Sequence, residues 1–339
     1  CHVAATWHLP CAASALVPGK NRPQKATNAH AFLMALALLT WLGAAANNPL
    51  WGDTLRGEPH KLRWVNTASV VRGSTPHARG GAAVTRHVLN DQDTVYLFGG
   101  CDDEGTCYDE LHTFDQTTNQ WSTLQNANNK PPSARRGHTI NVLGPAGKQR
   151  LYVWGGWRGI APVGNSLKCF DIHTRSWGLA ASGGRAPDAR WAHTATAIHN
   201  GAQMIVFGGE GAEDHYYNDL HLLDATPDAE KWYTLGVEGH TVPNDPEKRL
   251  PPARLGHTAT LLGSAIYVFG GYGHVEGARN ERTALGDLWV LDLSRGIRAL
   301  RWIDVHTVGK APVPRAFHAA AAGGATPLAP SSRPAATSF

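Results

Sequence analysis

Four histidines stand at one equivalent position of a repeated pattern, and their side chains are the first in this chain that could do chemistry. They are His138, His193, His257 and His318. Imidazole is a common metal ligand, so a ring of four could hold an ion. Each histidine, however, follows the same landmark arginine in its own repeat, as a framework residue would. We interpret them as structural residues satisfied by neighbouring backbone, and we predict no metal site.

Four aspartates recur in the same way and are the candidates for general acid–base chemistry. They are Asp115, Asp171, Asp224 and Asp292. A catalytic carboxylate pair needs two different environments, whereas these four share one environment in each repeat. An aspartate in this place caps a turn by bonding to its own backbone. Because HExxH, Gly-x-Ser-x-Gly and P-loop patterns are also absent, we predict no catalytic residues, no cofactor and no enzyme activity.

The positions that vary between otherwise equivalent loops are better candidates for function. One set follows the landmark arginines, and the other follows the glycine pairs described below. Arg, Trp and Tyr recur in both sets, and these residue types dominate protein interfaces. We predict a partner-binding rim made by Arg136, Trp157, Arg158, Trp191, Glu210, Tyr272 and His274. The alternative is ordinary exposed loops, and the linker at 236–252 is either a second contact or a tolerated insertion.

The elements that must position these residues are short apolar strands that end in glycine pairs. Four such runs recur, at 95–100, 151–156, 204–209 and 266–271. Paired glycines allow a close backbone approach where the chain turns. The pairs are Gly99 and Gly100, Gly155 and Gly156, Gly208 and Gly209, and Gly270 and Gly271.

Other landmarks keep step with the glycine pairs. An arginine precedes each pair by 16 to 20 residues, and a tryptophan follows each pair by 21 to 31 residues. The tryptophans are Trp121, Trp177, Trp232 and Trp302. Each unit holds four predicted strands, and four-stranded units of about 50 residues are typical of propeller blades.

This set of landmarks resembles the kelch-repeat family of the galactose oxidase/kelch-like propeller superfamily, over residues 59–321. The resemblance implies an all-β, kelch-type β-propeller with four complete four-stranded blades, at about 76–123, 132–179, 187–234 and 251–304. It also implies a protein–protein interaction scaffold or adaptor that uses loops at one face. The alternatives are a secreted copper enzyme similar to galactose oxidase, whose Tyr, His and Cys-crosslinked Tyr positions we cannot map here, and a glycan-binding propeller.

The two ends of the repeat array each hold part of a further blade. Residues 60–67 contain Trp64, which resembles an outer strand, and residues 312–321 contain Arg315 and His318, which resemble an inner strand. Propellers commonly complete one blade from both termini, but here the middle strands are lacking. We therefore expect a truncated or irregularly closed ring. The Pro-, Ala- and Ser-rich tail at 322–339 is predicted to be disordered.

Composition and charge bear on partners and location. The net charge of +4 over 339 residues comes without a block of Lys or Arg, so we predict protein partners and no nucleic acid. The leader at 1–58 contains an apolar segment at 31–46, which is either a signal or anchor or a mispredicted stretch. Membrane association is expected only in the first case, and the location stays open, with the cytoplasm favoured over secretion. Cys101 and Cys107 either form a disulfide in an oxidising compartment or remain thiols.

Overall fold

The computed structural model describes residues 71–89, 92–125, 130–180, 182–236, 250–274 and 282–322. The leader at 1–58, the strand expected at 60–67, most of the linker at 236–252 and the tail beyond residue 322 lie outside the described residues. Apart from two 3-10 turns, at His199–Gly201 and Ala212–Asp214, the described regular structure is β-strand. Within the described ranges, no helix is both long and apolar enough to cross a membrane.

Four sheets of one design form the body of the molecule, and each contains the four antiparallel strands of one predicted blade. Blade 1 contains β2 (Ala83–Leu89), β3 (Gln92–Phe98), β4 (Leu111–Asp115) and β5 (Gln120–Thr123). Blade 2 contains β6 (Thr139–Leu143), β7 (Arg150–Trp154), β10 (Lys168–Asp171) and β11 (Ser176–Leu179). Blade 3 contains β13 (Thr194–Ile198), β14 (Gln203–Phe207), β15 (Leu220–Asp224) and β16 (Lys231–Leu235). Blade 4 contains β18 (Thr258–Leu262), β19 (Ala265–Phe269), β22 (Leu288–Asp292) and β23 (Arg301–Asp304).

Shorter strands join or extend these sheets. β1 (Arg72–Gly73) pairs in parallel with β5, and β12 (Gly183–Gly184) pairs in parallel with β16. β8 (Trp157–Arg158) and β9 (Ala161–Pro162) form a small hairpin. β17 (Arg254–Leu255), β20 (Tyr272–His274) and β21 (Arg282–Ala284) form a three-stranded sheet of their own.

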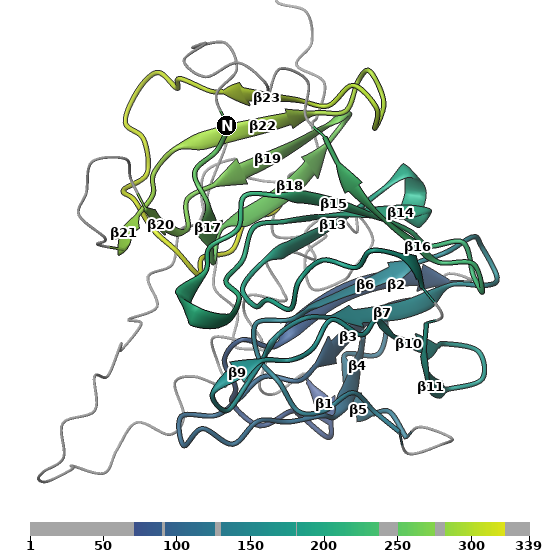
Figure 1. Ribbon diagram of the computed structural model, residues 1–339. Helices are drawn as coiled ribbons and strands as arrows, with labels where there is room; N and C mark the ends of the chain where they lie inside the picture. The colour runs from purple at the N-terminus through teal and green to yellow at the C-terminus, as the bar shows by residue number, and fades with distance from the viewer. Residues whose placement is uncertain are drawn as a thin grey trace, which may run out of the picture.

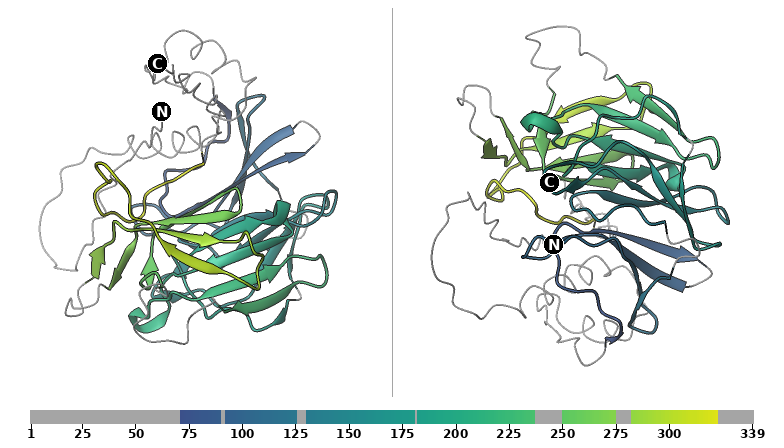
Figure 2. Two further views of the ribbon diagram at one scale, coloured as in Figure 1. Left: turned by 90° about the horizontal axis from the view of Figure 1, so that it is seen from above. Right: turned by 60° about the horizontal axis from the view of Figure 1, so that its bottom comes forward.

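The blades follow one another in chain order around a common axis. Their innermost strands β2, β6, β13 and β18 lie side by side in that order, and Figures 1 and 2 show the same succession from blue to yellow. This is the all-β propeller that the repeats predict. The turn at the far end of each strand pair is capped as expected: the backbone N–H groups of Thr117 and His173, for example, donate to the carboxylates of Asp115 and Asp171 at 2.8 and 2.9 Å.

Each pair of neighbouring blades buries a shared apolar core. One core lies between blades 1 and 2, one between blades 2 and 3, and one between blades 3 and 4. The outer-strand tryptophans of blades 2, 3 and 4 each pack on an aromatic ring of the preceding blade. The ring centroids are 5.4 Å apart for Trp177 and Phe98, 5.6 Å for Trp232 and Trp154, and 5.0 Å for Trp302 and Phe207. The repeated tryptophans therefore join blades together.

The glycine pairs lie where two blades approach most closely. A Cβ on Gly155 would be 2.6 Å from the ring of His193 in the next blade, and one on Gly156 would be 2.9 Å from His138 in its own blade. Both glycines also have φ above +60°. No other residue fits this position, because a side chain would push the histidines of two blades apart.

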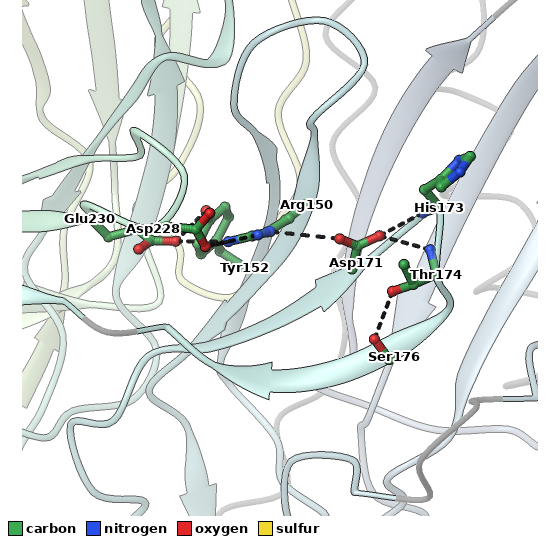
Figure 3. A network of polar contacts seen from close by, with 8 residues as sticks. All are labelled: Arg150, Tyr152, Asp171, His173, Thr174, Ser176, Asp228 and Glu230. Atoms are coloured by element: carbon green, nitrogen blue, oxygen red, sulfur yellow. Dashed lines mark hydrogen bonds and ion pairs between the residues drawn. The ribbon is translucent and has the colours of Figure 1, made fainter.

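A polar network crosses from blade 2 to blade 3 (Figure 3). Arg150 forms ion pairs with Asp228 at 3.1 Å and with the buried Glu230 at 3.4 Å. The hydroxyl of Tyr152 donates to the same Glu230 carboxylate at 2.9 Å. On its other side Arg150 lies 3.9 Å from Asp171. The network supplies hydrogen bonds and a cation to the Oε1 atom of a carboxylate that is buried at this interface, while its Oε2 atom has no hydrogen-bond partner among the described residues.

Blade 4 has an apolar face that is partly exposed among the described residues, whereas the equivalent face of blade 2 is covered by the next blade. Leu262 is 49% exposed and Tyr267 is 36% exposed, whereas their equivalents Leu143 and Tyr152 in blade 2 are buried. The chain continues beside blade 4 in residues 312–322, which form no strand but follow the sequence pattern of an inner strand. There Arg315 accepts a hydrogen bond from the backbone N–H of Gly271 at 2.8 Å.

Candidate functional site

The two loop sets that were predicted to form a rim lie at one end of the blades. A strand that ends at a glycine pair and a strand that begins after a landmark arginine run antiparallel, so their loops meet. Backbone bridges join Arg136 to Trp157 and Trp191 to Glu210, and β17 pairs with β20 through Leu255 and Tyr272. Figure 1 shows β9, β17, β20 and β21 along the same side of the blades. We call the loops after the arginines and the glycine pairs the loop rim.

Buried arginines fix the loop rim from beneath. Arg190 donates to the carbonyl of Gly208 at 3.1 Å and forms a bidentate pair with Asp219. Burial favours a raised pKa for Asp219, but the hydrogen bonds from His221 and Arg190 outweigh it and hold that pKa below its ordinary value. The same pairing with an acid occurs in blade 1, at Glu110, and in blade 4, at Asp287. The landmark arginines are therefore framework residues.

Blade 2 departs from this rule. Ser166 occupies the place of the acid, and Arg135 has no ion pair among the described residues, although it donates to Gly155 and Ser133. Burial, and next Arg158, lower the pKa of the Arg135 guanidinium to about 10. Because Arg136 adds a third cation, the blade 2 part of the loop rim is positively charged.

Aromatic rings connect the rim loops of successive blades. The centroids of Trp157 and Trp191 are 5.6 Å apart, and those of Trp191 and Phe317 are 6.1 Å apart in a stacked arrangement. Tyr272 lies 6.2 Å from Phe317 on the other side. Phe317 was not predicted as a site residue. It occupies the place of Gly137 and Gly256 in its repeat, and a bulky residue in a glycine place was the signal for it.

Glu210 is the acidic member of the loop rim, and it is buried. Its Oε1 accepts a hydrogen bond from Arg282 at 3.1 Å, while its Oε2 has no hydrogen-bond partner. Burial raises the pKa of Glu210, an effect that Arg282 opposes. Arg282 also pairs with Asp214 at 2.7 Å. Neither Arg282 nor Asp214 was predicted, because their loops differ in length between repeats.

The remaining predicted rim residues lie further out. Arg158 belongs to the β8–β9 hairpin, whose tip residue Ile160 is 94% exposed and was not predicted. The backbone of His274 pairs with Arg282 at the end of β20, but its side chain lies outside the described part of the structure. Its place in the rim stays a prediction.

Three of the repeated histidines bond to threonine side chains rather than to the backbone partners that were expected. Thr139 bonds to His193 of the next blade at 3.0 Å, Thr194 bonds to His257 at 2.9 Å, and Thr258 bonds to His318 at 3.1 Å. These threonines stand at the start of the inner strands of blades 2, 3 and 4, whereas His138 interacts with the backbone of Phe98, as expected. Among the described residues, no group of three or more His, Cys, Asp or Glu side chains is placed to hold a metal ion.

Cys101 and Cys107 were expected either to form a disulfide or to remain thiols, and the structure contains the disulfide. Cys101 and Cys107 are bonded and close the rim loop of blade 1. Inside this loop the Asp102 carboxylate accepts hydrogen bonds from the backbone of Thr106 at 2.8 Å and from the hydroxyl of Tyr108 at 2.8 Å. The acidic loop is therefore internally bonded.

Known proteins resemble this chain over the region just described. The family model for the KLHDC2/KLHL20/DRC7 Kelch-repeats domain matches residues 31–158 and 145–326. Kelch domain-containing protein 3 of Bos taurus is 32% identical over 75% of this chain and 62% of its own length. Acyl-CoA-binding domain-containing protein 4 of Arabidopsis thaliana is 29% identical over 75% of this chain and 34% of its own. Host cell factor 2 of Homo sapiens is 29% identical over 59% of this chain and 24% of its own length. The chain thus spans about 62% of the length of its Kelch domain-containing protein 3 relatives.

Proposed function

Because this chain belongs to the kelch-repeat family, we propose that it is a non-catalytic scaffold that binds a protein partner through its loop rim. The binding residues in this proposal are Arg136, Trp157, Arg158, Trp191, Glu210, Tyr272 and His274, with Phe317 added. Relatives with kelch repeats support an interaction role, and the choice of this face and these residues is our own.

The observation that carries the proposal is the row of aromatic rings across the loop rim. Trp157, Trp191 and Phe317 come from different loops, and the centroids of successive rings are 5.6 and 6.1 Å apart. Rigid aromatic side chains are frequent interface hot spots, since they bury a large area at a small entropic cost. Cationic Arg136 beside Trp157 and acidic Glu210 beside Trp191 would fix the orientation of a partner.

Substitution at the loop rim tests this proposal. The full chain with Arg136, Arg158 and Trp191 all changed to alanine would be compared with the unchanged chain for the proteins that each captures from source-cell extract. Hot-spot residues cost about 2 kcal/mol or more when truncated, so we expect at least a 30-fold loss of affinity for a rim-bound partner.

A matched control uses three exposed cations on turns at the opposite end of the blades, Lys148, Arg175 and Arg295. Their triple alanine variant should capture the same proteins at unchanged levels. Capture that survives the rim variant in full would show that the partner binds elsewhere.

A further inference from the structure

Arg282 reaches the loop rim from a neighbouring blade. It begins β21, the last strand of the small sheet above blade 4, yet its guanidinium pairs with Glu210 and Asp214 of blade 3 at 3.1 and 2.7 Å. The same guanidinium lies 5.3 Å from the ring centroid of Tyr216, also in blade 3. The blade 3 rim therefore already binds one guanidinium, through two carboxylates and an aromatic face.

The acceptor side of this contact is fixed, whereas the donor side is loose. The Glu210 side chain is 6% exposed, and its backbone is bridged to Trp191 and Tyr216. The Arg282 side chain is 48% exposed and lies outside the four blade sheets. Ion pairs of so exposed a side chain contribute little to stability. Arg282 can therefore leave its carboxylates at a small cost to the fold.

The charge at this point is unbalanced even with Arg282 in place. Glu210 and Asp214 face a single guanidinium, and the Oε2 atom of Glu210 has no donor in good hydrogen-bond geometry among the described residues, although the Trp191 indole interacts with the carboxylate. A buried carboxylate oxygen without a donor is costly. A cation that entered more deeply than Arg282 would supply the missing hydrogen bond.

We propose that Glu210, Asp214 and Tyr216 form a receptor for an arginine side chain of the partner protein, and that Arg282 occupies this receptor until the partner displaces it. Arginine fits better than lysine, because its planar fork reaches two carboxylates at once and stacks on an aromatic ring. The inference rests on the proposed function, since it assigns a chemical class to one part of the loop rim.

Titration of the full chain with N-acetyl-arginine amide tests the receptor directly. The readout is the indole N–H resonance of Trp191, which lies beside Glu210, and N-acetyl-citrulline amide is the uncharged control. Because Arg282 competes for the site, Arg282→Ala should bind the arginine probe about 2- to 5-fold more tightly than the unchanged chain. Arg295→Ala, on the opposite end of blade 4, should bind it as the unchanged chain does.

Removing the receptor carboxylates should reverse that gain. The double variant Arg282→Ala, Glu210→Gln should lose binding of the arginine probe. If Glu210→Gln lowers the folded fraction, Asp214→Asn serves in its place, because the Asp214 side chain is 77% exposed. Equal binding of arginine and citrulline probes, or no gain in Arg282→Ala, overturns the receptor.

Partner capture separates this inference from the proposed function. Arg282→Ala should increase capture, and Glu210→Gln should decrease it. Capture that responds to the Arg136, Arg158 and Trp191 variant but to neither of these overturns the receptor and leaves the rim proposal standing. If the triple variant captures the partner as well as the unchanged chain does, the rim proposal is overturned, whatever the result of the arginine titration.

Discussion

Ala83 lacks the hydroxyl group that forms the inter-blade hydrogen bond at the equivalent position of the later blades. It occupies the place of Thr139 and Thr194 in the later repeats, and so His138 of blade 2 lacks the threonine partner that His193 and His257 have. Neither ring nitrogen of His138 has a partner in good hydrogen-bond geometry among the described residues, although the ring interacts with the backbone of Phe98. A buried polar group without a partner lowers stability.

Ala83→Thr should therefore stabilise the protein by about 1 kcal/mol, because the new hydroxyl would bond to His138. Urea unfolding measures the change. Thr194→Ala is the matched reverse substitution and should destabilise by a similar amount. A lower unfolding free energy in Ala83→Thr would mean that the first interface has no room for the hydroxyl.

Sequence reasoning at this scale found the residues that repeat and the polar or aromatic residues that replace them. It overlooked Phe317, although a bulky residue in the place of Gly137 and Gly256 was a visible signal. It could not find Arg282 or Asp214, because they pair with each other across two blades. The spacing of residues along one repeat does not tell where β21 lies relative to the neighbouring blade. The seven predicted rim residues remain predictions, although Arg136, Trp157, Trp191 and Glu210 do lie together.

The buried His138, His193 and His257, which precede inner strands, and the half-buried His318 make the stability of the blades depend on pH. Burial lowers the pKa of His138 to about 3 and that of His318 to about 4, and it lowers the pKa values of His193 and His257 well below 6.5. The folded state thus keeps these rings neutral, while the unfolded chain binds protons below about pH 6.5.

The free energy of unfolding should accordingly be constant above pH 6.5 and fall as the pH drops towards 4. Each histidine contributes about 1.4 kcal/mol per pH unit in that range. The paired carboxylates, such as Asp219, have lowered pKa values and act only at more acid pH. Urea unfolding at a series of pH values measures the slope, and His318→Gln should make it shallower. An unchanged slope in that variant would contradict the assignment to these histidines.

β7 and β16 are joined by the network around Glu230, and this contact should dominate the interface between blades 2 and 3. Arg150→Ala leaves a buried carboxylate without its cation, so we expect a loss of about 3 kcal/mol in unfolding free energy. The double variant Arg150→Ala, Glu230→Gln removes the stranded charge and should recover most of that loss. A double variant as unstable as Arg150→Ala would show that Arg150 acts by packing alone.

For the molecule as a whole, we propose a propeller domain at 59–321 with residues 60–67 and 312–321 contributing to one incomplete blade. Val95, Leu97 and Phe114 form an apolar cluster on the side of blade 1 that faces away from blade 2. This is the side on which the outer strand of a preceding unit would pack.

Deletion of residues 1–58 should leave the melting temperature unchanged, whereas deletion of residues 1–70 should lower it by several degrees, because residues 60–67 are predicted from the sequence to supply an outer strand. Thermal unfolding of both truncated chains measures the difference. Equal melting temperatures would place the domain boundary after Trp64.

The number of strands per unit and the all-β fold could be predicted because the same pattern of landmark residues occurs in four repeats. Ring closure could not, because it depends on segments that occur once. Residues 312–321 follow the inner-strand pattern, and Arg315 and Phe317 do make the inter-blade bonds of that place. The spacing of the landmark residues does not predict which segments supply the other strands of the blade that contains residues 312–321.

The apolar face of blade 4 gives the molecule a weak end. Blades in such an array are stabilised only by their neighbours, so cohesion is a sum of local interfaces. Blades 2 and 3 are held on both sides, whereas among the described residues blade 4 packs on blade 3 at one side and meets only the segment 312–322 at the other. Local unfolding should therefore begin in blade 4 rather than in the central blades. Hydrogen exchange should show it as faster opening of β19 and β22 than of β14 and β15.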